Sequence, residues 1–283
     1  MIRQPCVAGR FYQGNKSQLL AQIESCYQNV LGIRDQKLEK TGKLKALVSP
    51  HAGYVFSGPP ATYGFSRLKL ENPLPERIIL MGPKHTPYGA LMAVDSSRAW
   101  LTPLGEIPVD EDFADLLVKN CKGLELDSDA HRYEHSIEVQ LPFLQHLYQD
   151  APLRIVPIAF GYTSFANLAY IAKEMKAFLA AQDLSKTLFL VSSDFSHDTA
   201  REEAYRLDAE VIDLVLKGDA EEFYHLIIDE DRSVCGVMPL TVLLLLLEGR
   251  KVITKLLKYS TSMDVMDHDR GVGYASISFE EPE

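Results

Sequence analysis

The chain has 283 residues, 46% of them hydrophobic and 24% charged, which is an ordinary composition for a globular protein. Its formal net charge of -10, with lysines and arginines scattered along the chain, argues against nucleic acid or an anionic membrane as the main partner. The amino terminus lacks the pattern of a secretory signal, and the longest apolar run, around residues 242–247, is too short to span a bilayer. We therefore expect a cytoplasmic protein.

The spacing of apolar residues predicts helices and strands that alternate along the chain. In the first half we expect a helix over 17–31 capped by Ser17, a strand over 43–49, a helix over 61–70, a strand over 78–81, extended pieces at 91–94 and after a turn at 102–106, and a helix following Asp110 to about residue 119. In the second half we expect helix on both sides of Pro142 within 130–147, strands over 154–160 and 187–191, helices over 164–181, 202–216, 220–228 and 238–248, and a closing strand pair over 251–260 and 274–279.

Alternating strands and helices predict an α/β fold: a three-layer α/β/α domain with a central sheet. The closing strand pair indicates that this sheet is mixed rather than purely parallel. We find no linker and no internal repeat, so we expect residues 1–283 to form a single domain.

Three of the predicted strands end in the same way, in a polar loop that carries one histidine. The histidines are His51, His85 and His197. Loops at the carboxyl ends of strands in an open α/β sheet meet at one crevice, where ligands bind. Three imidazoles in one crevice would suit a metal site or an acid/base site. Taken singly, each histidine has an alternative role in hydrogen bonding to a loop carbonyl.

Acidic residues accompany two of the histidine segments. Asp194 stands three residues before His197 and is a candidate either to orient that ring or to cap the following turn. His131 to His135 matches the H-x-x-E-H motif of a class of zinc proteases, in which a helix would place both histidines on one face. Alternatively, Glu134, His135 and Glu138 approach the crevice from its side, or form the polar stripe of a half-buried helix. The acidic loop 264–269 does not fit a calcium-binding pattern and is expected to be a solvated turn.

The four cysteines are far apart, form no C-x-x-C pair and indicate no disulfide framework. Three of them are expected to be small buried hydrophobic residues. Cys235 directly precedes the apolar helix 238–248, and a thiol at a helix amino terminus can have a lowered pKa and act as a soft metal ligand. A buried structural cysteine is the alternative.

Taken together, these motifs resemble the Memo family, which in prokaryotes is also called AmmeMemoRadiSam system protein B. The resemblance extends nearly from end to end of the chain. The segments that carry it are 5–12, 49–58, 82–85, 102–105, 134–144, 192–197, 235–236 and 271–274.

The Memo family is similar in fold to class III extradiol dioxygenases, which hold non-haem iron with two histidines and one glutamate. The resemblance implies that His51 and His85 stand at the two histidine ligands and Cys235 at the glutamate ligand. It places His197, with Asp194 beside it, near the acid/base histidine. A thiolate in place of the carboxylate favours copper(I), iron or zinc over a metal that prefers oxygen ligands.

We therefore expect a Memo-family metal-binding protein, redox-active or oxygenase-like, acting on an unknown small molecule or peptide. Iron or copper is the expected metal, with zinc as the third candidate, and His197, Asp194 and His135 are the candidate catalytic residues. The resemblance also implies receptor-tyrosine-kinase signalling in animal members and protein partners associated with radical-SAM enzymes in prokaryotic ones. One alternative is a non-catalytic protein that binds a peptide or partner in the same crevice, and another is true extradiol cleavage.

Overall fold

Residues 1–149 and 151–282 are described by a computed structural model, and within them the largest element is a mixed sheet of eight strands. The strands of this sheet, in spatial order, are β11 (Ile253–Thr261), β13 (Gly273–Glu281), β2 (Lys43–Ser49), β9 (Thr187–Ser192), β3 (Arg77–Pro83), β8 (Arg154–Phe160), β4 (Met92–Val94) and β7 (Glu125–Leu126). The four central strands, β2, β9, β3 and β8, are parallel to one another. The final hairpin of β11 and β13 adds to β2 in the antiparallel sense, so the predicted strand pair and the mixed sheet are confirmed.

Two small sheets and eleven helical segments surround the large sheet in the described residues. The short strands are β1 (Ile2–Arg3), β5 (Ala99–Thr102) and β6 (Gly105–Pro108) in one small sheet, and β10 (Thr199–Ala200) and β12 (Arg270–Gly271) in the other. The α-helices are α1 (Lys16–Gln28), α2 (Tyr54–Lys69), α3 (Glu111–Asn120), α4 (Leu141–Tyr148), α5 (Phe165–Ala180), α6 (Arg201–Lys217), α7 (Ala220–Asp229) and α8 (Val237–Leu247). Three short 3-10 helices, η1 (Asp129–His131), η2 (Glu138–Gln140) and η3 (Ser262–Asp264), complete the set.

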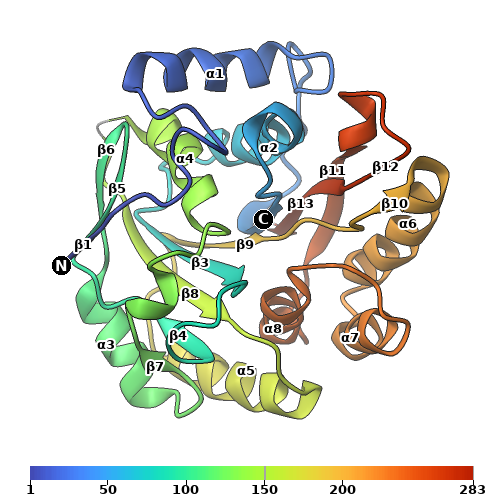
Figure 1. The fold of residues 1–283 in the computed structure, drawn as a ribbon. Coiled ribbons are helices and arrows are strands. Elements are labelled where there is room, and N and C mark those ends of the chain that lie inside the picture. Colours follow the sequence, from blue (N-terminus) through green and yellow to red (C-terminus); the bar gives the residue numbers. More distant parts are fainter. Residues whose placement is uncertain (150, 283) are drawn as a thin grey trace.

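The sheet lies between two layers of helices, as the sequence predicts (Figure 1). Side chains of a strand alternate between its two faces. In β3, Ile78 and Leu80 pack with the buried residues of α1, α2 and α4, whereas Ile79 and Met81 pack with those of α3, α5, α6, α7 and α8. Both faces of the central strands are therefore apolar and buried, which is typical of parallel strands covered on both sides.

The structure corrects three of the predicted elements. The segment 130–147 is not helical on both sides of Pro142: η1, a turn and η2 come first, and α4 begins at Leu141 with Pro142 in its first turn. The helix expected at 61–70 begins at Tyr54, because Pro59 and Pro60 lie inside it rather than before it. The side chain that caps α1 belongs to Asn15, not Ser17.

None of the helices in the described residues is long and apolar enough to cross a membrane.

Candidate metal centre

The three histidine loops leave neighbouring strands at one edge of the sheet. β9 lies between β2 and β3 and pairs with both, with Ser192 opposite Ser49 and Val191 opposite Met81. The strands before His51 and His85 are therefore not adjacent, and the loop of Asp194 and His197 lies between them. This arrangement places the three loops in one crevice, as expected at the carboxyl ends of parallel strands.

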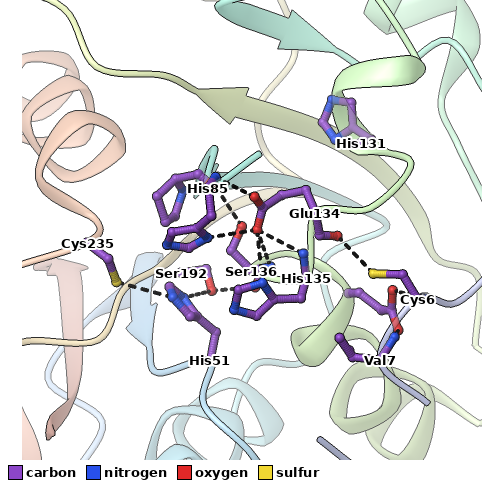
Figure 2. A network of polar contacts seen from close by, with 12 residues as sticks. Cys6, Val7, His51, His85, His131, Glu134, His135, Ser136, Ser192 and Cys235 are labelled. Atoms are coloured by element: carbon purple, nitrogen blue, oxygen red, sulfur yellow. Dashed lines mark hydrogen bonds and ion pairs between the residues drawn. The ribbon is translucent and has the colours of Figure 1, made fainter. Parts of the chain in front are cut away.

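His51, His85 and Cys235 each direct one ligand atom into a common space, and these atoms lie within 4.8 Å of one another. Cys235 Sγ and His51 Nε2 lie 3.2 Å apart. Figure 2 shows Cys235 entering from the side of α8, opposite Glu134 and His135. Gly236 allows this close approach, because a Cβ atom there would lie 2.3 Å from Ser193 Cβ.

Hydrogen bonds fix which nitrogen of His51 faces the cluster. The hydroxyl of Ser192 donates to the carbonyl oxygen of Ser136 at 2.6 Å, so its oxygen must accept the proton on His51 Nδ1, 2.9 Å away. The tautomer with Nδ1–H leaves the lone pair of Nε2 pointing at Cys235. His51 is also buried, and burial lowers its pKa, so the ring is neutral as a metal ligand requires.

Glu134 plays the same part for His85. Its carboxylate accepts hydrogen bonds from His85 Nδ1 at 3.0 Å and from the backbone N–H of His85, His135 and Ser136. These bonds, with the positive charge that His85 can carry, hold the pKa of Glu134 well below its usual range despite its burial. Burial alone would lower the pKa of His85, but the hydrogen bond and charge of Glu134 raise it above its ordinary value of 6.5. An imidazole held by a carboxylate in this way is a common support for a metal ligand.

His135 closes the cluster on a third side. Its ring stacks on His85, with centroids 4.9 Å apart, and meets the rings of His51 and Phe11 edge-on. His85, Glu134 and His135 form a second group whose ligand atoms lie within 4.8 Å. The hydrogen bonds that Glu134 accepts occupy its carboxylate, so this second group serves to support the first rather than to hold an ion of its own.

Cys235 differs from the expected low-pKa thiol. Burial, and then the negative charge of Asp194, raise its pKa well above the ordinary value of 9.0. The position before α8 does not lower it, because the thiol is half-buried and lies beside the carboxyl group of Asp194. In the absence of a cation, the thiol is therefore protonated, and its one proton has two acceptors within reach, His51 Nε2 at 3.2 Å and the carbonyl oxygen of Asp194 at 3.4 Å.

Asp194 is buried behind Cys235 and holds the loops rather than the ring of His197. Its carboxylate accepts the backbone N–H of His51 at 2.7 Å, and its own N–H points at Cys235 Sγ at 3.2 Å. Burial raises its pKa to about 6. It does not cap a helix, since it forms an isolated β-bridge with Tyr274.

The ring of His197 is oriented by Ser233 rather than by Asp194. The carbonyl oxygen of Ser233 lies 2.8 Å from His197 Nδ1, which therefore carries the proton, while the Ser233 hydroxyl accepts the backbone N–H of His197. The other ring nitrogen, Nε2, has no protein partner in the described part of the chain. His197, His85 and Cys235 line one cavity, so this nitrogen is available to a molecule bound there.

His131 is not part of the site, which removes the zinc-protease interpretation. The residue is fully buried, its Nε2 lies 3.0 Å from the carbonyl oxygen of Ala93, and Figure 2 shows it apart from the cluster. His131 and His135 do not share a helical face, because the chain between them is a turn. Of the three residues that orient the imidazoles, Glu134 is considered in the sequence analysis without this role, and neither Ser192 nor Ser233 is assigned it there.

The donor set fits a soft or borderline metal ion. Two imidazole nitrogens and one sulfur suit copper(I), iron or zinc better than magnesium or calcium, which prefer oxygen. The rings are fixed by Ser192 and Glu134, so the set is formed before an ion binds. Three protein ligands would leave a coordination position open toward the cavity.

Comparison with known proteins gives consistent matches over the full length. A family model described as "Memo-like protein" matches residues 3–278. A MEMO1 family protein of Archaeoglobus fulgidus is 40% identical over 98% of this chain and 99% of its own, and one of Methanococcus maripaludis is 38% identical with the same coverage. Among solved structures, the uncharacterized protein JW3007 from Escherichia coli K12 matches with a TM-score of 0.55 at 17% identity, over 83% of this chain and 99% of that one, which shows a shared fold.

Proposed function

Since the chain belongs to the Memo-like protein family, we propose that it is a metal-binding protein in which His51, His85 and Cys235 hold a single ion. The observation that carries the proposal is the convergence of their ligand atoms within 4.8 Å. The cluster combines residues from three distant parts of the chain, and each histidine has its Nδ1 occupied by a hydrogen-bond partner. Such support of the ligands from a second layer is typical of metal sites.

Iron or copper is the metal we propose, with zinc as the third candidate. Iron or copper, when bound, supplies one-electron redox chemistry, which makes a redox-active or oxygenase-like enzyme the favoured class. The protein's own contribution is to orient two imidazoles. When an ion binds, Cys235 and any protonated His85 lose a proton, because the thiolate and the neutral imidazole are the ligand forms. His51 Nε2 lies 3.2 Å from this thiol but is itself a ligand atom and must stay unprotonated, so the proton of Cys235 leaves by way of the cavity that Cys235 lines.

His197 is the proposed general acid/base, since its Nε2 faces the cavity and its Nδ1–H is held by Ser233. His135 and Asp194 act on the same site from either side. His135 packs against both ligand rings, and Asp194 accepts the backbone N–H of His51 through its carboxylate and points its own N–H at Cys235 Sγ. We therefore propose that these two residues position the ligands.

Extradiol cleavage is a weaker candidate. A carboxylate is present beside the site, but Glu134 accepts four hydrogen bonds from the protein and does not take the third ligand position. The thiol of Cys235 stands there instead, so the set of two histidines and one carboxylate is not formed.

Metal analysis of protein purified without an affinity tag tests the proposal. We expect wild type to bind one equivalent of iron or copper, and a His51→Ala/Cys235→Ser double variant to bind none with comparable affinity. The matched control is His268→Ala/Cys26→Ser, which removes an imidazole and a thiol outside the cluster and should bind as wild type does. Equal binding by all three proteins would refute the site assignment.

A binding function without chemistry remains the second candidate, because two exposed tyrosines lie beside the site. Tyr88 and Tyr133 are each 54% exposed and their rings meet edge-on at 5.7 Å. Exposed aromatic side chains favour contact with a peptide or protein, and the resemblance to prokaryotic members suggests a radical-SAM-associated protein as that partner. Partner binding that persists in the metal-free double variant would favour this function over the first.

A further inference from the structure

The ligand atoms of the cluster open onto a cavity of about 470 Å³. His85, His197 and Cys235 lie in its lining, whereas His51 is only 2% exposed and lies behind them. The volume is in the range of small-molecule sites in proteins, which is roughly 300–1,000 Å³. A molecule in this cavity would therefore have one end beside His85 and Cys235.

The wall of the cavity that faces these residues is largely apolar. It is built by the end of β8, the end of α7 and the start of α8, and its apolar members are Phe160, Ile227, Ile228, Val234, Val237 and Met238. A wall of this kind gains free energy by removing hydrocarbon or aromatic surface from water. The body of the ligand is therefore apolar.

Two cations also line the cavity, and they differ in how far their charge is already neutralised. Arg232 donates to the carboxylates of Glu210 and Glu230 and to the carbonyl oxygen of Leu207. Lys84 has a single hydrogen bond, from Nζ to the carbonyl oxygen of Thr86 at 2.9 Å, and no carboxylate among the described residues lies within ion-pair distance. The remaining charged group, Asp231, is exposed to solvent.

We propose that this cavity binds a small monocarboxylate with an apolar body, whose carboxylate is paired with Lys84 beside the metal cluster and whose body lies against the apolar wall. A carboxylate suits Lys84 because two of its ammonium protons are free of protein acceptors in the described chain. One unneutralised cation matches one negative charge, which favours a carboxylate over a phosphate dianion. The proposal rests on the proposed function only in placing the ligand beside a metal centre, since the pairing with Lys84 does not depend on a metal.

Binding of matched acid and amide pairs to the full-length protein tests the proposal. The probes are hexanoate, phenylacetate and 3-phenylpropionate, each compared with its neutral amide by calorimetry or ligand-observed NMR. We expect at least one acid to bind more tightly than its amide, and Lys84→Met to weaken binding of that acid roughly 10-fold or more, as loss of a charged hydrogen bond implies. The amide should bind wild type and Lys84→Met equally.

Matched variants distinguish the effect of the Lys84 charge from a loss of folding and from the removal of a lysine elsewhere. Lys84→Arg keeps the charge and should retain part of the preference, whereas Lys173→Met removes an exposed lysine on α5 and should leave it intact. Lys84→Met should fold normally, because its backbone N–H still donates to Phe160. Ile228→Trp should fill the cavity and weaken binding of acid and amide alike.

The proposal is overturned if no acid binds, if acid and amide bind wild type equally, or if Lys84→Met binds the acid as wild type does. Repeating the titration with the His51→Ala/Cys235→Ser variant separates it from the proposed function. If Lys84-dependent binding persists while metal binding fails in wild type, the cavity assignment holds and the metal centre is wrong. If metal binds as proposed but no acid preference is seen, only the inference drawn here is wrong.

Discussion

Ser192 shows how much of the site depends on one hydroxyl. It receives hydrogen bonds from Gln140 Nε2 at 2.8 Å and from His51 Nδ1, and it donates to Ser136. The hydroxyl has only one proton, which it donates to the carbonyl oxygen of Ser136. Its oxygen can therefore only accept the hydrogen bond from His51 Nδ1. The side chain therefore sets the His51 tautomer from outside the ligand set.

Ser192→Ala should lower metal affinity about 10- to 100-fold, as loss of a residue that orients a metal ligand typically does. The cause is that Nδ1 of His51 loses its acceptor, and the ring is then free to rotate or to place its proton on Nε2. Affinity would be measured by competition with a chelator of known strength. Ser276→Ala is the matched control, because it also removes a buried hydroxyl that donates to a carbonyl, that of Pro60, and leaves the site intact. Equal affinity in both variants would show that Ser192 contributes packing alone.

At this scale the sequence predicts the members of the cluster better than the residues that support them. His51, His85 and Asp194 follow strand ends directly, so their meeting at one edge follows from the fold class. Cys235 comes from the helical side of the crevice, and its part in the cluster came from the family resemblance. The contact of Ser233 with His197 spans 36 residues and has no local pattern, so only the folded chain reveals it.

At the scale of elements, the strands and most helices agree with their sequence patterns because burial follows the same periodicity. β2 and β8 have the predicted bounds, and β9 extends one residue further, to Ser192. The errors occur where side chains compete for the backbone. In 130–138, Glu134 takes the N–H groups of His135 and Ser136, and Arg3 takes the carbonyl groups of His131 and Glu134, so a continuous helix cannot form.

A buried ion pair joins α2 to β13 of the large sheet. Arg67 binds both carboxylate oxygens of Glu280 at 2.9 Å and one oxygen of Glu71 at 2.8 Å, and both Arg67 and Glu280 are fully buried. Burial would raise the pKa of Glu280, but the hydrogen bonds and charge of Arg67 outweigh it and lower the pKa from 4.5 to about 2. The carboxylate of Glu280 therefore binds a proton more readily in the unfolded chain than in the folded one.

Glu280→Gln should therefore lower the free energy of unfolding and also make that free energy depend less on pH in the acidic range. The pair contributes fully above pH 4.5, and its contribution is lost as the pH falls from there toward about 2. Breaking a buried pair costs about 3–5 kcal/mol, so the variant should lose this much at neutral pH and show a smaller further loss in acid. Urea unfolding at neutral and acidic pH measures both effects. Glu281→Gln, which removes a half-exposed partner of Lys45 and Arg250, should cost no more than about 1 kcal/mol, and an equal loss in both variants would contradict the argument.

At the scale of the whole molecule, the first residues of the chain are part of the site's support. Arg3 is 4% exposed, lies over the ring of Trp100 at 4.1 Å and forms an ion pair with Glu138. Its remaining donors reach the carbonyl oxygens of His131 at 3.0 Å and Glu134 at 2.6 Å. Glu138 in turn accepts from Tyr12 and from the backbone at Cys6 and Val7. The amino-terminal segment and the loop that orients His85 therefore form one hydrogen-bonded unit.

Arg3→Met should weaken metal binding although Arg3 touches no ligand. Without the Arg3 guanidinium, the loop 131–138 loses two hydrogen bonds to its backbone carbonyl oxygens and the ion pair of Glu138. Glu134 then no longer holds His85 as firmly. We expect a loss of about 3–5 kcal/mol in the free energy of unfolding, as for other buried pairs that lose one partner, and a lower metal affinity at temperatures where the variant is folded. Arg3→Lys should not restore either quantity, because a single ammonium group cannot reach acceptors that the planar guanidinium contacts in several directions.

The control for this prediction lies in the same segment. Arg10 is exposed and donates only to the carbonyl oxygen of Cys6 at 3.1 Å, so Arg10→Met should leave stability and metal affinity close to wild type. Hydrogen exchange of residues 131–138 gives an independent measurement, since faster exchange there should accompany the weaker metal binding of Arg3→Met. If Arg3→Met is destabilised but binds metal as tightly as wild type, the segment stabilises the fold without holding the site.

Because the ligands come from residues 51, 85 and 235, metal binding should in turn stabilise the whole chain, by about 2.7 kcal/mol at a free metal concentration of 100 times the dissociation constant. At the same metal concentration, the free energy of unfolding of Arg3→Met should increase by less, because the folded variant binds the metal more weakly.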